Sequence, residues 1–341
     1  MKNIYDLLFT ELQSFFEEKR LPKFHAEQIF DWLYKKRVDD FFEMKNIKKD
    51  LQEELKELFK TNFIKLVEKK EAKDVKKYLI ELEDKNLIEA VLLKQNYGNS
   101  LCISTQVGCN MDCLFCESGK LKKIRNLDSF EMVQQILLVE KEEKIRVSHV
   151  VVMGIGEPFD NYQSVIKFIN TINHPKGLAI GARHITVSTC GIVPKIDQFA
   201  NEGLQVNLAI SLNAANDKTR TMLMPINKVY NLESLIKSVK KYIRKTNRRV
   251  TFEYILLKGI NDREEDALAL VKLIRGINCY VNLIPYNQTN NSKLVATSKE
   301  QIMQFYDIMK KNKINVTIRK ELGTNIFAAC GQLKSKYEEE K

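Results

Sequence analysis

Apolar and polar positions follow two different periods along most of the chain. From about residue 100, short runs rich in β-branched residues alternate with longer runs whose apolar residues recur every three or four positions. The short runs read SLCIST, VSHVVVM, HITVST, QVNLAIS, VTFEYILL and YVNLIPY, and a last one, NVTIRK, follows them. Six strand-then-helix units predict an α/β fold in which a parallel sheet, closed as a barrel or partial barrel, lies inside a layer of helices. Active-site residues of such a fold lie on the loops that follow the strands.

The first hundred residues have a different pattern. Up to residue 60, apolar residues recur at helical spacing, which predicts a small helical accessory domain over 1–60. Residues 61–98 hold the shorter runs FIKLVE, KYLIEL and LIEAVLLK, which predict hairpins in a β connector. The αβ alternation then defines a catalytic domain over 99–333, followed by a charged tail over 334–341.

Composition adds the compartment and a hint about partners. No apolar run approaches 18 residues, and the first twenty residues mix Glu and Lys into their apolar positions, so we expect neither a membrane span nor a signal peptide. A cytoplasmic protein is expected. With 55 Lys+Arg against 44 Asp+Glu, the 341 residues carry a formal charge of +11. That balance suits a nucleic-acid-binding surface, and it equally suits a surface on which lysine and glutamate are simply interleaved.

Cysteine spacing is the strongest chemical signal. Four of the seven cysteines fall between Cys102 and Cys116, and Cys109, Cys113 and Cys116 form a CxxxCxxC motif directly after the first predicted barrel strand. Three soft thiolates suit an iron–sulfur cluster or zinc. A structural zinc ion needs a fourth ligand, and no histidine lies at a short ligand spacing from the motif. Three cysteines on a four-iron cluster leave one iron open to an exogenous ligand.

The motif resembles the signature of radical S-adenosylmethionine (SAM) enzymes. Further blocks occur in the order of the RlmN/Cfr family of RNA adenine methyltransferases, namely SLCISTQVGCNMDCLFC, MGIGEPFDN, GARHITVSTCGIVPKI, LAISLNA, LMPIN, NLIPYN and AACGQL. The N-terminal FHAEQIFDWLYKKRVDDFFEM is similar to that family's helical accessory domain. The resemblance covers nearly the whole chain. It implies a radical SAM partial (β/α)6 barrel with an N-terminal helical accessory domain and a short β connector.

The resemblance also implies the cofactors and the residues that bind them. One 4Fe–4S cluster is expected on Cys109, Cys113 and Cys116. SAM is expected twice per turnover, as methyl donor and as radical source. Its implied contacts lie on the loops after the predicted strands and are Gly156, Glu157, Ser188, Ser211, Leu212, Asn213 and Asn287.

Two cysteines outside the motif have implied catalytic roles. Cys330 matches the cysteine that takes a methyl group from the first SAM and, as a methylene radical, adds to the adenine. Cys102 matches the thiol that then forms a transient disulfide with Cys330 and releases the product. Glu89 resembles the base that removes the ring proton. Without the resemblance, two small buried thiols and a strand glutamate on the surface would be the simpler reading.

The implied reaction is methylation of carbon 2 of an adenine. Its substrates would be the peptidyl-transferase centre of 23S rRNA and the adenine 3′ of the anticodon in some tRNAs. Methylation of carbon 8 in 23S rRNA, as in the other branch of the family, is the alternative. A changed RNA substrate is another, because Asn213 replaces a family histidine and Asn325 and Phe327 replace family acids. Other radical SAM chemistry and a zinc-stabilised RNA-binding module are the competing classes.

Partners and minor positions complete the expectations. An electron donor such as flavodoxin or ferredoxin is implied, and a monomer is expected. Cys190 and Cys279 match no family role, and we expect neither thiol to be essential. The candidate contacts to RNA phosphates, each also readable as an ordinary surface charge, are Arg125, Arg183, Arg244, Arg248 and Arg249.

Overall fold

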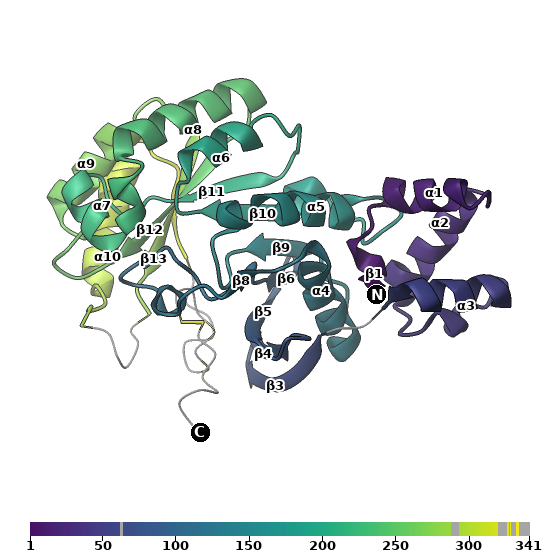
Figure 1. The fold of residues 1–341 in the computed structure, drawn as a ribbon. Helices are drawn as coiled ribbons and strands as arrows, with labels where there is room; N and C mark the ends of the chain where they lie inside the picture. Colours follow the sequence, from purple (N-terminus) through teal and green to yellow (C-terminus); the bar gives the residue numbers. More distant parts are fainter. Residues whose placement is uncertain (62–63, 288–292, 320–325, 327, 329–331, 334–341) are drawn as a thin grey trace.

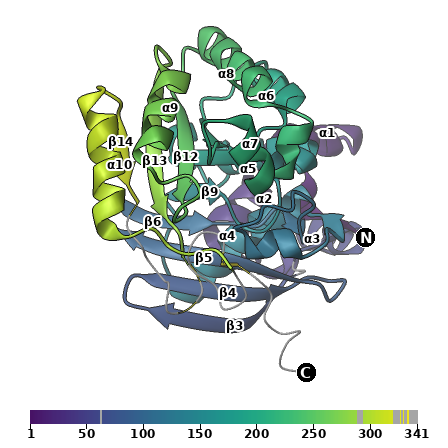
Figure 2. The same cartoon turned by 90° about the vertical axis from the view of Figure 1, so that its left-hand side faces the viewer.

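A single mixed sheet forms the centre of the molecule in this computed structural model (Figures 1 and 2). The structure describes residues 1–61, 64–287, 293–319, 326, 328 and 332–333. The strand order is β14-β13-β12-β11-β10-β9-β6-β5-β4-β3, and the pairs from β6 to β14 are all parallel. The parallel strands are β6 (Gly98–Cys102), β9 (His149–Val152), β10 (Ile185–Thr189), β11 (Asn207–Ser211), β12 (Val250–Leu256), β13 (Cys279–Pro285) and β14 (Val316–Ile318). Every predicted barrel strand is therefore present.

Helices cover the outer face of the parallel strands, as Figure 1 shows. The six predicted ones are α4 (Ser129–Glu143), α5 (Tyr162–Asn173), α6 (Val193–Phe199), α8 (Leu232–Thr246), α9 (Glu264–Ile274) and α10 (Lys299–Lys311). One further helix, α7 (Asp217–Leu223), lies between β11 and α8 and was not predicted. It is only seven residues long, and Pro225 follows directly, so it offers too few turns for a periodic signal. The partial barrel itself is confirmed.

The predicted connector continues the barrel sheet. Strands β3 (Lys65–Ala72), β4 (Val75–Glu81) and β5 (Leu87–Gln95) form antiparallel hairpins, and β5 pairs in turn with β6. Cys102 at the end of β6 lies opposite Val91 of β5. The hairpins therefore extend the sheet beyond the first barrel strand, and β5 lies directly beside Cys102.

The N-terminal helices pack against the barrel. They are α1 (Phe9–Glu18), α2 (Phe24–Phe30) and α3 (Lys49–Leu58), and a π-helix over Asp31–Lys36 follows α2. Their buried side chains belong to the same apolar cluster as the barrel core. Phe9 stacks on His174 at a centroid distance of 4.5 Å, and the Arg37 guanidinium lies 2.7 Å from the buried Glu140 carboxylate of α4. None of the described helices is long and apolar enough to cross a membrane.

The Arg37–Glu140 ion pair is expected to stabilise the contact between the N-terminal region and the barrel. Burial raises the pKa of Glu140, and its carboxylate is held by the N–H of Val147 and by Arg37. Replacing Arg37 by Met leaves a buried charge without its partner and should lower the free energy of unfolding by about 1–3 kcal/mol. Chemical denaturation measures the change. The double variant Arg37→Met/Glu140→Gln should recover part of the loss, and equal losses in the single and double variants would contradict this explanation.

Candidate active site

The cysteine motif lies on a loop that is fastened at several points. The loop follows β6 and the short strand β7 (Gln106–Val107), and Gly108 turns it with φ +73°, where an added Cβ would lie 2.2 Å from the Lys122 carbonyl oxygen. The N–H of Cys109 donates to the carbonyl of Leu121 at 2.9 Å. The N–H of Leu114 donates to Leu223 at the end of α7, also at 2.9 Å. The motif therefore spans from the first barrel strand to α7.

The three motif thiols are neighbours in a poorly hydrated place. Burial, together with the charges of Cys116 and Glu157, raises the pKa of Cys109 to about 12. Burial also raises the pKa of Cys113 and Cys116, and Cys113 is affected in addition by both other thiols. Three adjacent thiolates are stable here only with a cation that offsets both their repulsion and their lost hydration. The donor set therefore fits a metal cluster.

Among the described residues, no three Cys, His, Asp or Glu side chains converge closely enough to hold one metal ion. In a four-iron cluster each cysteine would bind a different iron.

The loop after β9 crosses directly over the loop after β6. An added Cβ at Gly154 would lie 2.5 Å from the Ile103 carbonyl oxygen, and Gly156 has φ +110° with Gln106 within 2.7 Å of its Cβ position. Glu157 is buried, and its carboxylate accepts from the N–H groups of Phe159 at 3.0 Å and Cys190 at 2.8 Å. Burial raises the pKa of Glu157, and these two bonds oppose the increase. Glu157 thus joins the loops after β9 and β10 beside the cysteines.

The other expected SAM contacts lie at the carboxyl ends of neighbouring strands. Ser188 is on β10 and Ser211 ends β11, and Asn287, which is buried, follows β13. Leu212 is fully buried, its N–H donates to the Glu253 carbonyl at 3.0 Å, and its carbonyl accepts from the N–H of Ala214 at 2.8 Å. Asn213 adopts φ +58°, which Asn tolerates, and its Oδ1 accepts from the N–H of Ile255 at 2.9 Å. The Asn213 side chain therefore holds the loop itself.

A buried arginine supports the rim of the site, by which we mean the loops after β10 and β11. Arg220 on α7 is fully buried, and its Nη2 donates to the Cys190 carbonyl at 2.7 Å and to the Ser211 carbonyl at 3.3 Å. Its Nε donates to Leu212 at 3.1 Å, and its Nη1 donates to the Asn227 side chain at 2.9 Å. The sequence analysis did not identify Arg220. A lone arginine in an irregular segment carries no periodic or motif signal.

The proposed thiol chemistry maps onto the sheet face next to β6. Cys102 packs against an apolar cluster that contains Val91 from β5 and Ala328 and Leu333 from the C-terminal segment. The Ser118 hydroxyl, next to the cysteine motif, donates to the Leu333 carbonyl at 2.8 Å. Cys330, with its expected disulfide to Cys102, lies outside the described residues, as do Asn325 and Phe327. Ala328 and Leu333, described residues on the two sides of Cys330, belong to the apolar cluster against which Cys102 packs.

Glu89 lies on this same face. It is two residues from Val91 on β5, so both side chains point to the Cys102 side of the sheet. The Glu89 carboxylate is buried and lies 2.9 Å from Nζ of Lys77 on β4. A surface position for Glu89 is therefore wrong.

The five candidate RNA-binding arginines differ in their availability. Arg125 is bound by Asp84 and by both carboxylate oxygens of Glu131, and Arg248 donates to Val206, Gln205 and Asn207. Arg249 lies over the ring of Tyr280 at 5.1 Å. Arg183 and Arg244 are exposed.

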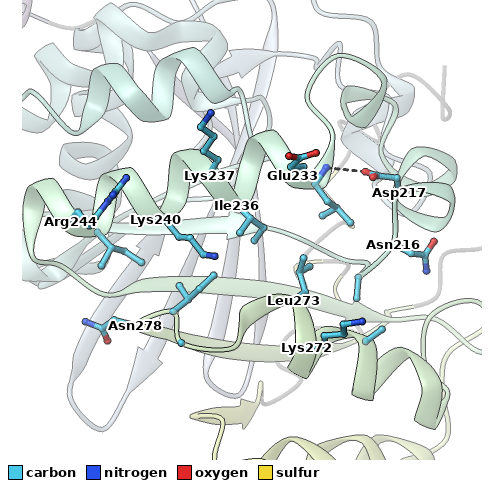
Figure 3. Close-up of a pocket in the computed structure, with 16 residues that line it drawn as sticks. Asn216, Asp217, Glu233, Ile236, Lys237, Lys240, Arg244, Lys272, Leu273 and Asn278 are labelled. Carbon is cyan, nitrogen blue, oxygen red and sulfur yellow. Dashed lines mark hydrogen bonds between the residues drawn. The ribbon is translucent and has the colours of Figure 1, made fainter.

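Arg244 lines a groove on the outside of the barrel between α8 and α9 (Figure 3). The groove has a volume of about 1190 Å³, and its floor includes Ile236 and Leu273. Lys237, Lys240 and Lys272 line it together with Arg244. None of the expected cofactor residues reaches this groove, so it is separate from the candidate active site.

Comparisons with known proteins agree with this site. Residues 103–271 match the family model of the radical SAM superfamily. A crystal structure of a radical SAM methyltransferase from Sphaerobacter thermophilus is similar at 37% identity with a TM-score of 0.93, over 98% of this chain and 99% of that one. Fold and site thus define a radical SAM methyltransferase, with the 4Fe–4S cluster and SAM that this class uses.

Relatives over the full length narrow the assignment. Residues 2–61 match the ribosomal RNA large subunit methyltransferase N-terminal domain. A probable dual-specificity RNA methyltransferase RlmN from Enterococcus faecalis is 55% identical, over 98% of this chain and 96% of that protein. One of the same name from Acholeplasma laidlawii is 51% identical, over 97% and 98%. The chain belongs to the RlmN family, which confirms the resemblance seen in its sequence.

The Arg220 contacts predict a large structural effect. Replacing Arg220 by Met removes charged hydrogen bonds to five acceptors in a buried place and should lower the free energy of unfolding by at least about 3 kcal/mol. The control, Arg263→Met at an exposed position, should change it by less than about 0.5 kcal/mol. Anaerobic denaturation of the cluster-loaded protein checks both. Equal stability of the two variants would show that Arg220 does not support the rim.

The crossing of the two loops predicts a steric effect at Gly154. Gly154→Ala places a methyl group against the backbone of Ile103 and Ser104, which cannot move aside as a side chain could. The free energy of unfolding should fall by about 1–3 kcal/mol, and less iron should be retained per chain. Gly181 has open space around its Cβ position, so Gly181→Ala should keep both values near those of the original protein. Retention of full stability and iron in Gly154→Ala would contradict the close approach.

Proposed function

We propose that this enzyme methylates carbon 2 of an adenine in RNA, in the peptidyl-transferase centre of 23S rRNA and 3′ of the anticodon in some tRNAs. The main support is the full-length similarity, at about half of all positions, to relatives named dual-specificity RNA methyltransferase RlmN. Both the N-terminal family model and the radical SAM model contribute to it.

In this proposal, separate residues at the strand ends bind the cluster and SAM. When bound, the cluster and SAM supply the 5′-deoxyadenosyl radical that activates an otherwise unreactive methyl group. Cys109, Cys113 and Cys116 hold the cluster from one fastened loop. Gly156 and Glu157 keep the neighbouring loop close to it, and the residues after β10, β11 and β13 (Ser188, Ser211, Leu212, Asn213 and Asn287) form the rest of the SAM site.

The face next to β6 carries the covalent chemistry. Cys330 carries the methyl carbon on its sulfur and links it to the adenine. The Cys102 thiolate then attacks that sulfur, so that the S–S bond forms as the S–C bond breaks, and the released carbon takes a proton to become the methyl group of the product. Packing of Ala328 and Leu333 against the Cys102 cluster supports this pairing. Glu89 takes the ring proton. Its place on the Cys102 side of the sheet supports that role, and Nζ of Lys77 lies 2.9 Å from its carboxylate.

The surface outside the site serves the macromolecular partners. We assign residues 1–60 to RNA contact, together with the exposed cations Arg183 and Arg244. Contacts from such cations to RNA phosphates would position the RNA without reading its sequence. Lys237, Lys240 and Lys272 extend the basic edge beside Arg244. A flavodoxin or ferredoxin supplies the electrons. The enzyme is a monomer. Its catalytic domain covers residues 99–333, the hairpin region covers 61–98 and the tail covers 334–341.

Mass spectrometry of nucleosides tests this function. Deleting the gene should remove 2-methyladenosine from both 23S rRNA and tRNA, and a plasmid copy should restore it. Copies with Cys330→Ala or Cys102→Ala should not restore it, whereas Cys279→Ser should, because Cys279 is buried in the core away from the cluster loop. Loss of 8-methyladenosine instead would move the enzyme to the carbon-8 branch. Unchanged levels of both nucleosides would refute the RNA substrates proposed here.

A further inference from the structure

A buried glutamate inside the barrel has no role in the chemistry described so far. Glu253 lies on β12 in register with Ser211 on β11, so the two side chains point to the same face of the sheet. The carbonyl of Glu253 accepts from the N–H of Leu212 at 3.0 Å and from that of Asn213 at 3.3 Å. The loop expected to bind SAM is therefore held by hydrogen bonds to the backbone carbonyl of Glu253.

Burial raises the pKa of Glu253, the charge of Arg319 opposes that increase, and only one of the two carboxylate oxygens has a hydrogen-bond partner among the described residues. Its Oε1 accepts from the Asn282 amide at 3.0 Å, and the Thr317 hydroxyl fixes that amide by donating to Oδ1 of Asn282 at 2.9 Å. Its Oε2 is buried and has no hydrogen-bond partner among the described residues. The side chain is 5% exposed. Burying an unmatched carboxylate oxygen costs free energy, so a hydrogen-bond donor is expected to meet it in the working enzyme.

Space for such a donor is present. A cavity of about 680 Å³ adjoins Glu253, and Asn282, Thr251, Thr186, Thr317 and Arg319 are among the residues that line it. Ser188 and Ser211 do not line this cavity, but Ser188 is two residues from Thr186 on β10 and therefore lies on the same face of the sheet. The free oxygen of Glu253 thus belongs to the same interior face as Ser188 and Ser211.

We propose that Glu253 is a further cofactor-binding residue whose Oε2 accepts a hydrogen bond from a ribose hydroxyl of SAM. This inference rests on the proposed SAM site at Ser188 and Ser211. The ammonium group of SAM is expected at the cluster and the sulfonium has no hydrogen to donate, which leaves the ribose hydroxyls and the adenine amino group. An O–H donor forms the shorter and stronger bond to a carboxylate, and this favours the ribose. Asn282 and Thr317 hold the carboxylate in place for it.

Equilibrium binding of SAM to the cluster-loaded enzyme, without RNA, tests the role directly. Glu253→Ala should raise the Kd for SAM by about 10–100-fold, since a hydrogen bond to a charged group is lost. Glu253→Gln keeps the shape and one acceptor oxygen, so its Kd should rise less. Glu233→Ala, at an exposed position on α8, is the matched control and should bind SAM as the original enzyme does.

Deoxy analogues of SAM separate direct contact from general damage. The original enzyme should bind the 2′-deoxy or the 3′-deoxy analogue more weakly than SAM, and Glu253→Ala should bind that analogue and SAM equally. Iron content and thermal melting verify that each variant is folded and loaded. Equal penalties for the missing hydroxyl in the original enzyme and in Glu253→Ala would overturn the proposal.

The remaining outcomes are also decisive. An unchanged Kd for SAM in both folded Glu253 variants refutes the contact, and so does a weaker affinity for tRNA with unchanged SAM binding. Failure of the proposed function is distinguishable, because 2-methyladenosine would then be unchanged by deletion of the gene while the dependence of SAM binding on the ribose hydroxyl still held.

Discussion

The rim of the active site depends on one buried guanidinium. Arg220 brings together the carbonyl groups of Cys190, Ser211 and Leu212, at the ends of β10 and β11, by donating to all three. Burial lowers the pKa of Arg220, and the nearby side chains of Cys190, Cys113 and Asp217 oppose that change. A planar fork of fixed donors suits several acceptors at once in a way that a lysine would not. The backbone carbonyl groups of these loops can therefore lie outside regular secondary structure and still accept hydrogen bonds.

This support reaches the metal-binding loop through α7. Arg220 lies on α7, and the last residue of the helix, Leu223, accepts a hydrogen bond from Leu114 inside the cysteine motif. Cys113 also packs against the apolar cluster that contains Leu223. The cluster loop and the SAM loops thus share one short helix as their foundation. A disturbance at Arg220 would therefore reach both the cluster loop and the SAM loops.

The sequence predicted the barrel well because its signal is local. Each strand and each long helix has its own period, and the cysteine spacing is complete within eight residues. The short helix α7 has no such period, and the extension of the sheet by β3–β5 depends on pairing between β5 and β6. Arg220 and Glu253 acquire their roles only when distant strand ends meet. The replacement of a family histidine by Asn213 is explained by its left-handed backbone and its bond to Ile255.

Glu253 illustrates why the remainder was not visible in the sequence. A glutamate within an apolar strand looks like a solvent-facing position, yet here the inward face of the sheet is polar and lines a cavity. The strand is stable because Asn282 satisfies one carboxylate oxygen and the backbone of Glu253 carries the next loop. The other oxygen remains a local cost within the described structure. Such costs persist where a ligand offsets them, which is why an incompletely satisfied buried group is a better guide to binding than the strand pattern that surrounds it.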